Sequence, residues 1–138
     1  MKRSQQTVRG IVQDIFEQLP AMVNGNANLR RLGQNCSLAF MLECDGISHH
    51  FRIDRGEIVE MATGTFRMRP WSFAIRAPET AWREFWQLHP KPGYQDIFAL
   101  ARFGHASVDG DMWPLLDHLR FIKEVLAAPR PLTPEAAQ

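Results

Sequence analysis

Two short turns, Asp45-Gly46 and Arg55-Gly56, enclose an eight-residue segment in which apolar and polar side chains alternate. Within residues 47–54 the odd positions are mostly apolar and the even positions are polar. This period of two is typical of a β-strand in a sheet that buries one face. Asp-Gly is also a residue pair that two-residue hairpin turns favour. The pattern therefore predicts three strands joined by two tight turns.

The segments on either side supply the remaining strands. Residues 36–44 alternate with Leu38, Phe40 and Leu42 on one face, and residues 57–61 follow the second turn. Residues 71–75 alternate again after a connection that contains Gly64. We expect these four strands to form an antiparallel meander, and a short extended piece at residues 104–108 to add a fifth strand.

Helical spacing occurs at both ends of this strand-rich region. Between residues 4 and 19 apolar side chains recur at three- and four-residue steps, which predicts an amphipathic helix that Pro20 ends. Residues 21–33 are rich in Asn and Gly and are predicted to be a loop with at most one short turn. Three more helices are predicted: one beginning near Pro78 with Trp82, Phe85 and Trp86, one over residues 94–102, and one over residues 112–126 capped by Asp111.

The chain has 138 residues, which suits a single domain, and its composition does not divide it in two. We expect one domain over residues 1–126, with an N-terminal helix in residues 1–20 and a core in residues 29–126. Residues 127–138 contain three prolines and several small side chains, and we expect them to form a disordered tail.

Charge and cysteine content exclude several classes of function. A net charge of +1 gives no electrostatic footprint for nucleic acid. Cys36 and Cys44 lie in one predicted strand about 26 Å apart, too far to form a disulfide, and no Cys/His cluster has metal-ligand spacing. The N-terminus lacks an apolar stretch of signal-peptide length, and no window approaches a membrane span. We therefore expect a soluble, cytoplasmic protein with no metal and no stable membrane insertion.

The order of these elements resembles the sterol carrier protein type-two (SCP2-like) family. The most similar pieces are residues 37–42 with their Asp-Gly turn, residues 71–75 with the following helix that carries Trp82, and residues 103–111, which end in Gly-Asp. The resemblance implies an α+β fold in which helices pack on one face of a five-stranded, mostly antiparallel sheet. It also implies a hydrophobic tunnel between the two layers that binds lipids, including sterols and fatty acyl chains.

Large apolar side chains are abundant: the chain has four tryptophans, nine phenylalanines and six methionines. Such side chains suit a pocket that adapts to an irregular apolar guest, although they also fill ordinary cores. If the tunnel exists, the inward positions of the strands and the facing helix stripes would line it. The predicted lining residues are Phe40, Phe51, Phe73, Trp82, Trp86 and Leu116.

Three polar residues are candidates for contact with a ligand head group. His49 falls on the apolar face of its strand, where it is either a satisfied core histidine or a group that orients a ligand. Arg67 and Arg69 would project to the same side of an extended segment. They are either solvated or form a clamp for a carboxylate or phosphate, which would favour an acidic lipid over a neutral sterol.

No common catalytic or cofactor signature is present, including a Gly-x-Ser-x-Gly elbow, a His-Glu-x-x-His motif and a Gly-rich phosphate loop. The leading hypothesis is a non-catalytic carrier for a hydrophobic small molecule such as a lipid, fatty acyl, sterol-like or quinone-like compound, with no cofactor. One alternative is an accessory subunit, with a closed core, of a lipid- or quinone-pathway enzyme. Another is a small enzyme that uses His49 or His105 as acid or base. The partners expected are the apolar ligand and a lipid-metabolising enzyme.

Overall fold

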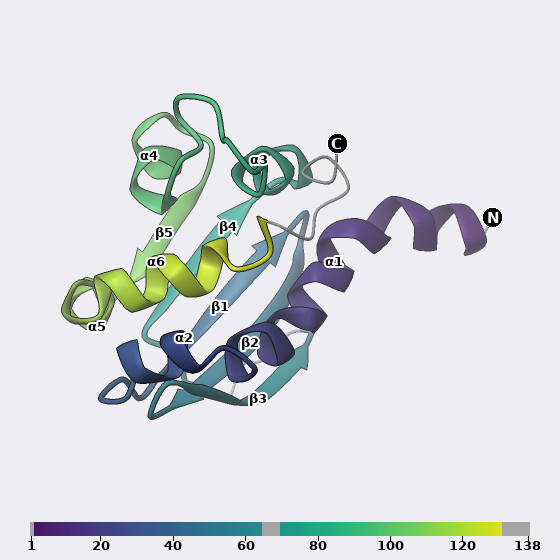
Figure 1. Ribbon diagram of the computed structural model, residues 1–138. Coiled ribbons are helices and arrows are strands. Elements are labelled where there is room, and N and C mark those ends of the chain that lie inside the picture. The colour runs from purple at the N-terminus through teal and green to yellow at the C-terminus, as the bar shows by residue number, and fades with distance from the viewer. Residues whose placement is uncertain (1, 65–69, 131–138) are drawn as a thin grey trace.

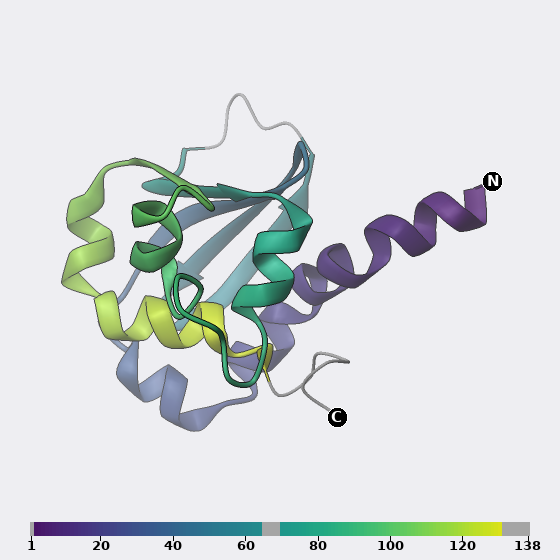
Figure 2. The ribbon, with the colours of Figure 1, turned by 90° about the horizontal axis from the view of Figure 1, so that it is seen from above.

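The protein consists of a five-stranded sheet with helices on one face (Figure 1). Its structure is a computed structural model that describes residues 2–64 and 70–130, with side chains from Gly10 onward. Seen from above, the sheet and the helices form two layers, and the N-terminal part of α1 projects beyond the body (Figure 2). The predicted α+β fold class is confirmed.

The strands follow the order β3-β2-β1-β4-β5 across the sheet. Their bounds are β1 (Leu38–Cys44), β2 (Ile47–Asp54), β3 (Glu57–Thr63), β4 (Phe73–Ala77) and β5 (Ser107–Gly110). The helices are α1 (Lys2–Asn24), α2 (Ala27–Leu32), α3 (Glu79–Phe85), α4 (Ile97–Arg102), α5 (Met112–Asp117) and α6 (Leu119–Ala127).

Both predicted hairpins are present, and their turns have matching backbones. Asp45 and Gly46 have φ values of 51° and 87°, and Arg55 and Gly56 have values of 52° and 85°. Left-handed φ at both turn positions is the geometry of a type I′ turn, whose twist matches that of the flanking strands. The two turns set the antiparallel pairing of β1 with β2 and of β2 with β3.

The fourth strand departs from the predicted meander. Instead of pairing with β3, β4 lies beside β1 and runs parallel to it, with Phe73 opposite Phe40. Four of its five residues are buried, in keeping with its place between β1 and β5 inside the sheet. On the helix-free face, Nε2 of His50 lies 3.1 Å from the carbonyl oxygen of Pro70, in the connection that leads into β4.

In the N-terminal part of the chain, α1 is longer than predicted and α2 lies in a segment predicted to be a loop. α1 continues through Pro20 to Asn24 because Leu19 and Val23 extend its buried stripe, and their packing outweighs the lost N–H bond at the proline. α2 forms within the predicted loop. The side chain of Asn26 caps it by accepting hydrogen bonds from two backbone N–H groups of its first turn.

The predicted C-terminal helix is divided in two at His118, where φ is −123° and ψ is 34°. The change of direction allows Leu115 of α5 and Phe121 of α6 both to face the core. Ordered structure extends past the predicted start of the tail, because Ala127 is the last residue of α6 and Arg130 is held by hydrogen bonds. Residues 131–138 lie outside the described part of the chain.

Asp111 has the predicted role of helix cap, since its Oδ1 accepts a hydrogen bond of 3.0 Å from the backbone N–H of Trp113. Replacing Asp111 with alanine is expected to lower the free energy of unfolding by about 1 kcal/mol, the usual loss for an N-cap. Asp117→Ala is the control, because Asp117 lies at the opposite end of α5, away from the N-cap. Urea denaturation measures both, and equal losses would contradict the capping role.

Candidate ligand-binding site

Three phenylalanine rings from neighbouring strands stack on the helix-covered face of the sheet. The strand register places Phe40 opposite Phe51 on one side and opposite Phe73 on the other. The ring centroids of Phe40 and Phe51 are 5.3 Å apart, and those of Phe40 and Phe73 are 5.5 Å apart. These three residues, called the ring ladder below, are fully buried.

A second group of rings, called the aromatic cluster below, comes from the helices and consists of Phe16 of α1 with Trp82 and Trp86 at α3. The Phe16 ring meets the two indoles at 5.1 and 5.5 Å in edge-on geometry, and the two indoles stack at 5.3 Å. Buried indoles need an acceptor for the N–H group. Trp82 donates to the carbonyl oxygen of Glu43, and Trp86 donates to that of Leu126.

His49 lies between the two groups of rings. Its ring centroid is 4.9 Å from that of Phe16 in the aromatic cluster and 6.4 Å from that of Phe51 in the ring ladder. The side chain is fully buried. Its place on the apolar face of β2 is the predicted one, and a polar imidazole is therefore held among aromatic rings at the centre of the molecule.

The structure brings five of the six predicted lining residues into this interior, namely Phe40, Phe51, Phe73, Trp82 and Trp86. Their rings contact one another, so side chains occupy the space in which the tunnel is predicted. The sixth, Leu116, does not face this interior: it is 48% exposed, whereas its neighbour Leu115 is buried. Arg67 and Arg69 lie outside the described residues.

Two hollows flank the C-terminal part of α6. The first has a volume of about 360 Å³ and lies between α6 and the α3–α4 connection. The second has a volume of about 680 Å³ and lies between α6 and the segment that joins α1 to α2. Glu124 and Ala127 of α6 line both of them. None of the six residues predicted to line the tunnel borders either hollow.

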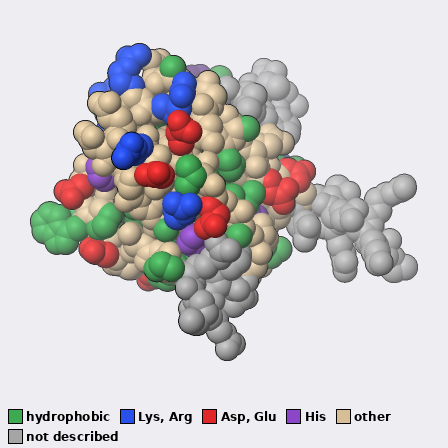
Figure 3. All heavy atoms as spheres, turned by 90° about the horizontal axis from the view of Figure 1, so that it is seen from below, with side chains coloured by type: hydrophobic (Ala, Val, Ile, Leu, Met, Phe, Trp, Pro, Cys, Tyr) green, Lys and Arg blue, Asp and Glu red, His purple; other side chains and the backbone are tan. Residues whose placement is uncertain are grey.

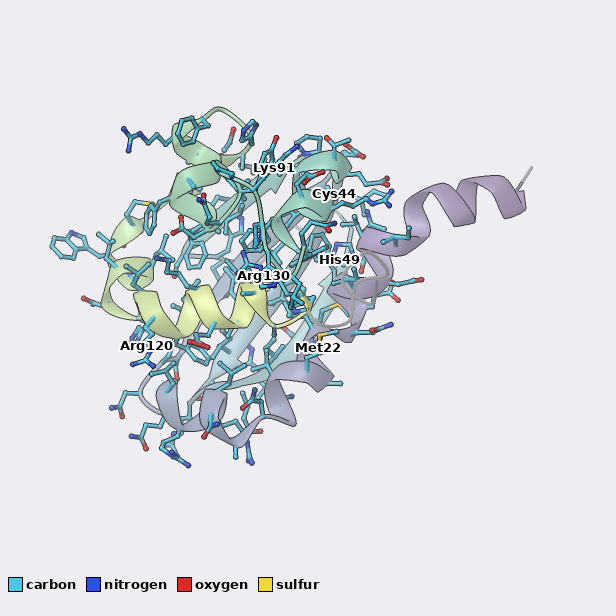
Figure 4. All side chains as sticks on the ribbon, turned by 45° about the horizontal axis from the view of Figure 1, so that its top comes forward. Met22, Cys44, His49, Lys91, Arg120 and Arg130 are labelled. Carbon is cyan, nitrogen blue, oxygen red and sulfur yellow. The ribbon has the colours of Figure 1, made fainter. Side chains whose placement is uncertain are left out.

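Arg130 is one of the residues that line the first hollow. Its Nε donates to the carbonyl oxygen of Phe85 at 2.9 Å, and one terminal nitrogen donates to that of Gln95 at 2.6 Å. The guanidinium also lies 4.8 Å from the centroid of the Phe85 ring. Burial lowers the pKa of Arg130, whereas the Asp96 carboxylate acts in the opposite direction. Figure 4 shows Arg130 at the end of α6 on the side facing α3, with Met22 on the other side of the helix.

Asp96 and Lys123 form an ion pair across the same hollow, with Nζ 3.2 Å from Oδ2. Burial alone would raise the pKa of Asp96, but the N–H of Ala99 and the Lys123 ammonium hold it below its ordinary value. Asp96 directly precedes a helical pattern, which is an N-cap signal that sequence reasoning could have used. Arg130 had no such signal, because it lies in a segment whose composition resembles a linker.

The two cysteines and the remaining polar clusters of the described residues offer neither a reactive thiol nor a metal site. Both cysteines are buried and unpaired, and burial raises the pKa of Cys36 to about 11 and, with help from nearby carboxylates, that of Cys44 to about 12. Neither is therefore a ready nucleophile. Among residues 2–64 and 70–130, no three His, Cys, Asp or Glu side chains gather as a metal site, and no described helix is long and apolar enough to cross a bilayer.

Large apolar side chains are exposed at several places on the surface, among them Val59, Leu88 and Phe103. Trp113 and Leu116 of α5 are 72% and 48% exposed. Seen from below, apolar side chains project at the end where α5 lies, and further apolar side chains lie among the basic and acidic ones over the rest of this face (Figure 3). His105, a candidate acid or base, stacks on Tyr94 with ring centroids 4.2 Å apart.

The two-layer architecture is that of sterol-carrier-type domains. No family model and no curated protein matches the chain. Among solved structures it is similar to a crystal structure of sterol carrier protein 2, with 15% identity, a TM-score of 0.62, and coverage of 85% of this chain and 94% of that one.

Two further solved structures show the same likeness. A conserved hypothetical protein from Thermus thermophilus, described as a candidate sterol carrier protein, has 13% identity, a TM-score of 0.60, and coverage of 91% of this chain and 92% of its own. A ubiquinone synthesis protein, UbiJ-SCP2, has 12% identity, a TM-score of 0.56, and coverage of 86% and 88%. The chain therefore has a sterol carrier protein 2-like fold, as its resemblance in sequence predicts.

Proposed function

We propose that the protein is a non-catalytic carrier or binding domain for a hydrophobic small molecule. The observation that carries this proposal is the interior itself, a continuous set of aromatic rings between sheet and helices in which His49 is a buried polar side chain. Aromatic side chains offer large apolar contact area, and a few placed polar groups are typical of small-molecule sites. The fold shared with sterol carrier protein 2 supports the same assignment.

If a ligand binds in the interior, as we propose, contacts between the aromatic rings there are replaced by contacts between the rings and the ligand. The first hollow is bordered by Phe85 and Leu126, which contact Trp86 of the aromatic cluster, so entry there would lead toward that cluster. His49 would then lie within reach of a polar atom of the ligand, as an orienting group.

The second candidate is an accessory subunit that works through its surface. It is favoured by the filled interior and by Trp113 and Leu116, whose exposure at one end of the molecule suits a protein contact. One protein with the same fold is described as a ubiquinone synthesis protein, which is in keeping with a partner in quinone metabolism.

A chain-length series distinguishes these candidates. Saturated fatty acids of about ten to sixteen carbons are titrated into the protein by calorimetry, and we expect affinity to rise about fourfold per methylene, the equivalent of about 0.8 kcal/mol. The matching alcohols test the head group, and His49→Leu should reduce any difference between acid and alcohol.

Solvent extraction and native mass spectrometry of the freshly purified protein provide the second measurement. A co-purified lipid together with the chain-length trend supports the carrier. If no lipid is present and no chain length binds, the carrier proposal fails and the accessory subunit takes its place. An affinity that is independent of chain length would mean that acids bind at the surface and not in the core.

A further inference from the structure

The C-terminal half of α6 is buried on its inner side and has a hollow on each of its flanks. The two hollows lie on either side of this half, and Glu124 and Ala127 border both of them. Its buried side chains, Phe121, Ile122, Val125 and Leu126, cover the interior. Removal of this half from the core would therefore open the interior from both sides.

Three hydrogen bonds join the end of α6 to α3 and the connection that follows it. Trp86 Nε1 donates to the carbonyl oxygen of Leu126 at 2.9 Å, and Arg130 donates to the carbonyl oxygens of Phe85 and Gln95. Two of these bonds have a charged donor and are stronger than neutral ones. The three bonds are called the latch below.

The other end of α6 has the geometry of a hinge. At His118 the backbone leaves the helical conformation, so α5 and α6 are separate segments joined at one residue. A few element-terminal residues that absorb a change of φ and ψ are sufficient for a hinged motion. The helix is therefore fixed at its C-terminal end by the latch and connected at its N-terminal end by a hinge.

We propose that α6 is the gate of the interior, that His118 is its hinge and that Arg130 and Trp86 are its latch. This inference rests on the proposed carrier function. The closed form is the one in the structure, with the aromatic cluster covered. In the open form the latch is broken, the two hollows join across the former position of residues 123–127, and an apolar molecule reaches Phe85 and the rings behind it.

Two variants weaken the latch by different routes, and one control keeps it. Arg130→Gln removes the charged donors, and Trp86→Phe retains a ring in the cluster but removes its N–H group. Arg120→Gln is the matched control, since Arg120 is an exposed arginine at the start of the same helix and far from the latch (Figure 4).

Hydrogen exchange followed by mass spectrometry measures the gate without any ligand. We expect the amides of residues 122–127 to exchange at least about tenfold faster in both latch variants than in the wild type and in Arg120→Gln, with β1 and β2 unchanged. Equal exchange in all four proteins would overturn the gate. Faster exchange throughout the sheet in one latch variant would mean that this variant is globally destabilised. In that case the exchange of residues 122–127 in the other latch variant tests the gate.

Stopped-flow mixing with a dansyl-labelled fatty acid measures entry. We expect its association rate constant to rise at least about threefold in the latch variants, because opening precedes binding, and to stay constant in Arg120→Gln. An unchanged rate constant despite faster exchange would overturn the role of α6 in entry. If the probe binds none of the proteins while exchange in α6 is accelerated, the carrier function fails but the motion of α6 stands.

Discussion

Replacing Trp86 with alanine is expected to lower the free energy of unfolding by about 3–5 kcal/mol, the range for large aromatic side chains removed from a core. Trp86 is 2% exposed, touches Phe16 and Trp82, and donates a hydrogen bond to Leu126. The substitution removes these contacts and leaves the carbonyl oxygen of Leu126 without its donor. Chemical denaturation followed by far-ultraviolet circular dichroism gives the loss.

Trp113→Ala is the control for this substitution, because it removes the same side chain from a position that is 72% exposed. We expect a change of less than about 0.5 kcal/mol there, as is usual for surface positions. Similar losses for the two tryptophans would contradict the structure, because they would mean that Trp86 does not pack in the interior.

Replacing Gly56 with alanine is expected to cost about 2–5 kcal/mol, the sum of a steric and a backbone contribution. A β-carbon at this position would lie 2.8 Å from the carbonyl oxygen of Arg30 and 2.9 Å from the backbone of Gly33, and neither atom can be moved by a side-chain rotation. Overpacking of this kind costs about 1–3 kcal/mol, and a left-handed φ in a residue with a β-carbon adds about 1–2 kcal/mol.

The first hairpin provides a control with the same backbone. Gly46 has a φ of 87°, close to the 85° of Gly56, but no atom lies within 4 Å of its added β-carbon. Gly46→Ala should therefore cost only the backbone part, about 1–2 kcal/mol. Thermal or urea denaturation of both variants separates the two contributions. Equal losses would show that the β2–β3 turn does not pack against Arg30 and Gly33.

The strands were predictable where their signal is local. The bounds of β2 follow from its alternation and its two turns, which involve neighbouring residues only. The pairing of β4 with β1 was not predictable in this way, because alternation identifies a strand but not its partner. α1 shows a similar conflict: the rule that proline ends a helix was outweighed by packing of Leu19 and Val23, which depends on the tertiary structure.

The residues of the candidate site that face inward could be predicted from the sequence, but the packing of their side chains could not. Periodicity placed Phe40, Phe51 and Phe73 on the inward face, and the structure confirms that they share it. Whether such rings leave a cavity or stack depends on strand register and side-chain rotamers, which periodicity does not determine. The break at His118 had no signal in the sequence, and the apolar stripe of residues 112–126 did not distinguish the buried Leu115 from the exposed Leu116.

The parallel pairing of β1 with β4 has a consequence for the order in which the chain folds. The contacts of β1, β2 and β3 are local, because each hairpin closes through a two-residue turn. β4 reaches β1 only after the whole of β2 and β3 has been passed, so its docking carries the larger loss of chain entropy. Phe40 can therefore meet Phe51 early, whereas its contact with Phe73 is completed late. A chain arrested between these two stages would present a half-covered row of phenylalanines to its surroundings, which is the surface that chaperones bind and that self-association begins from.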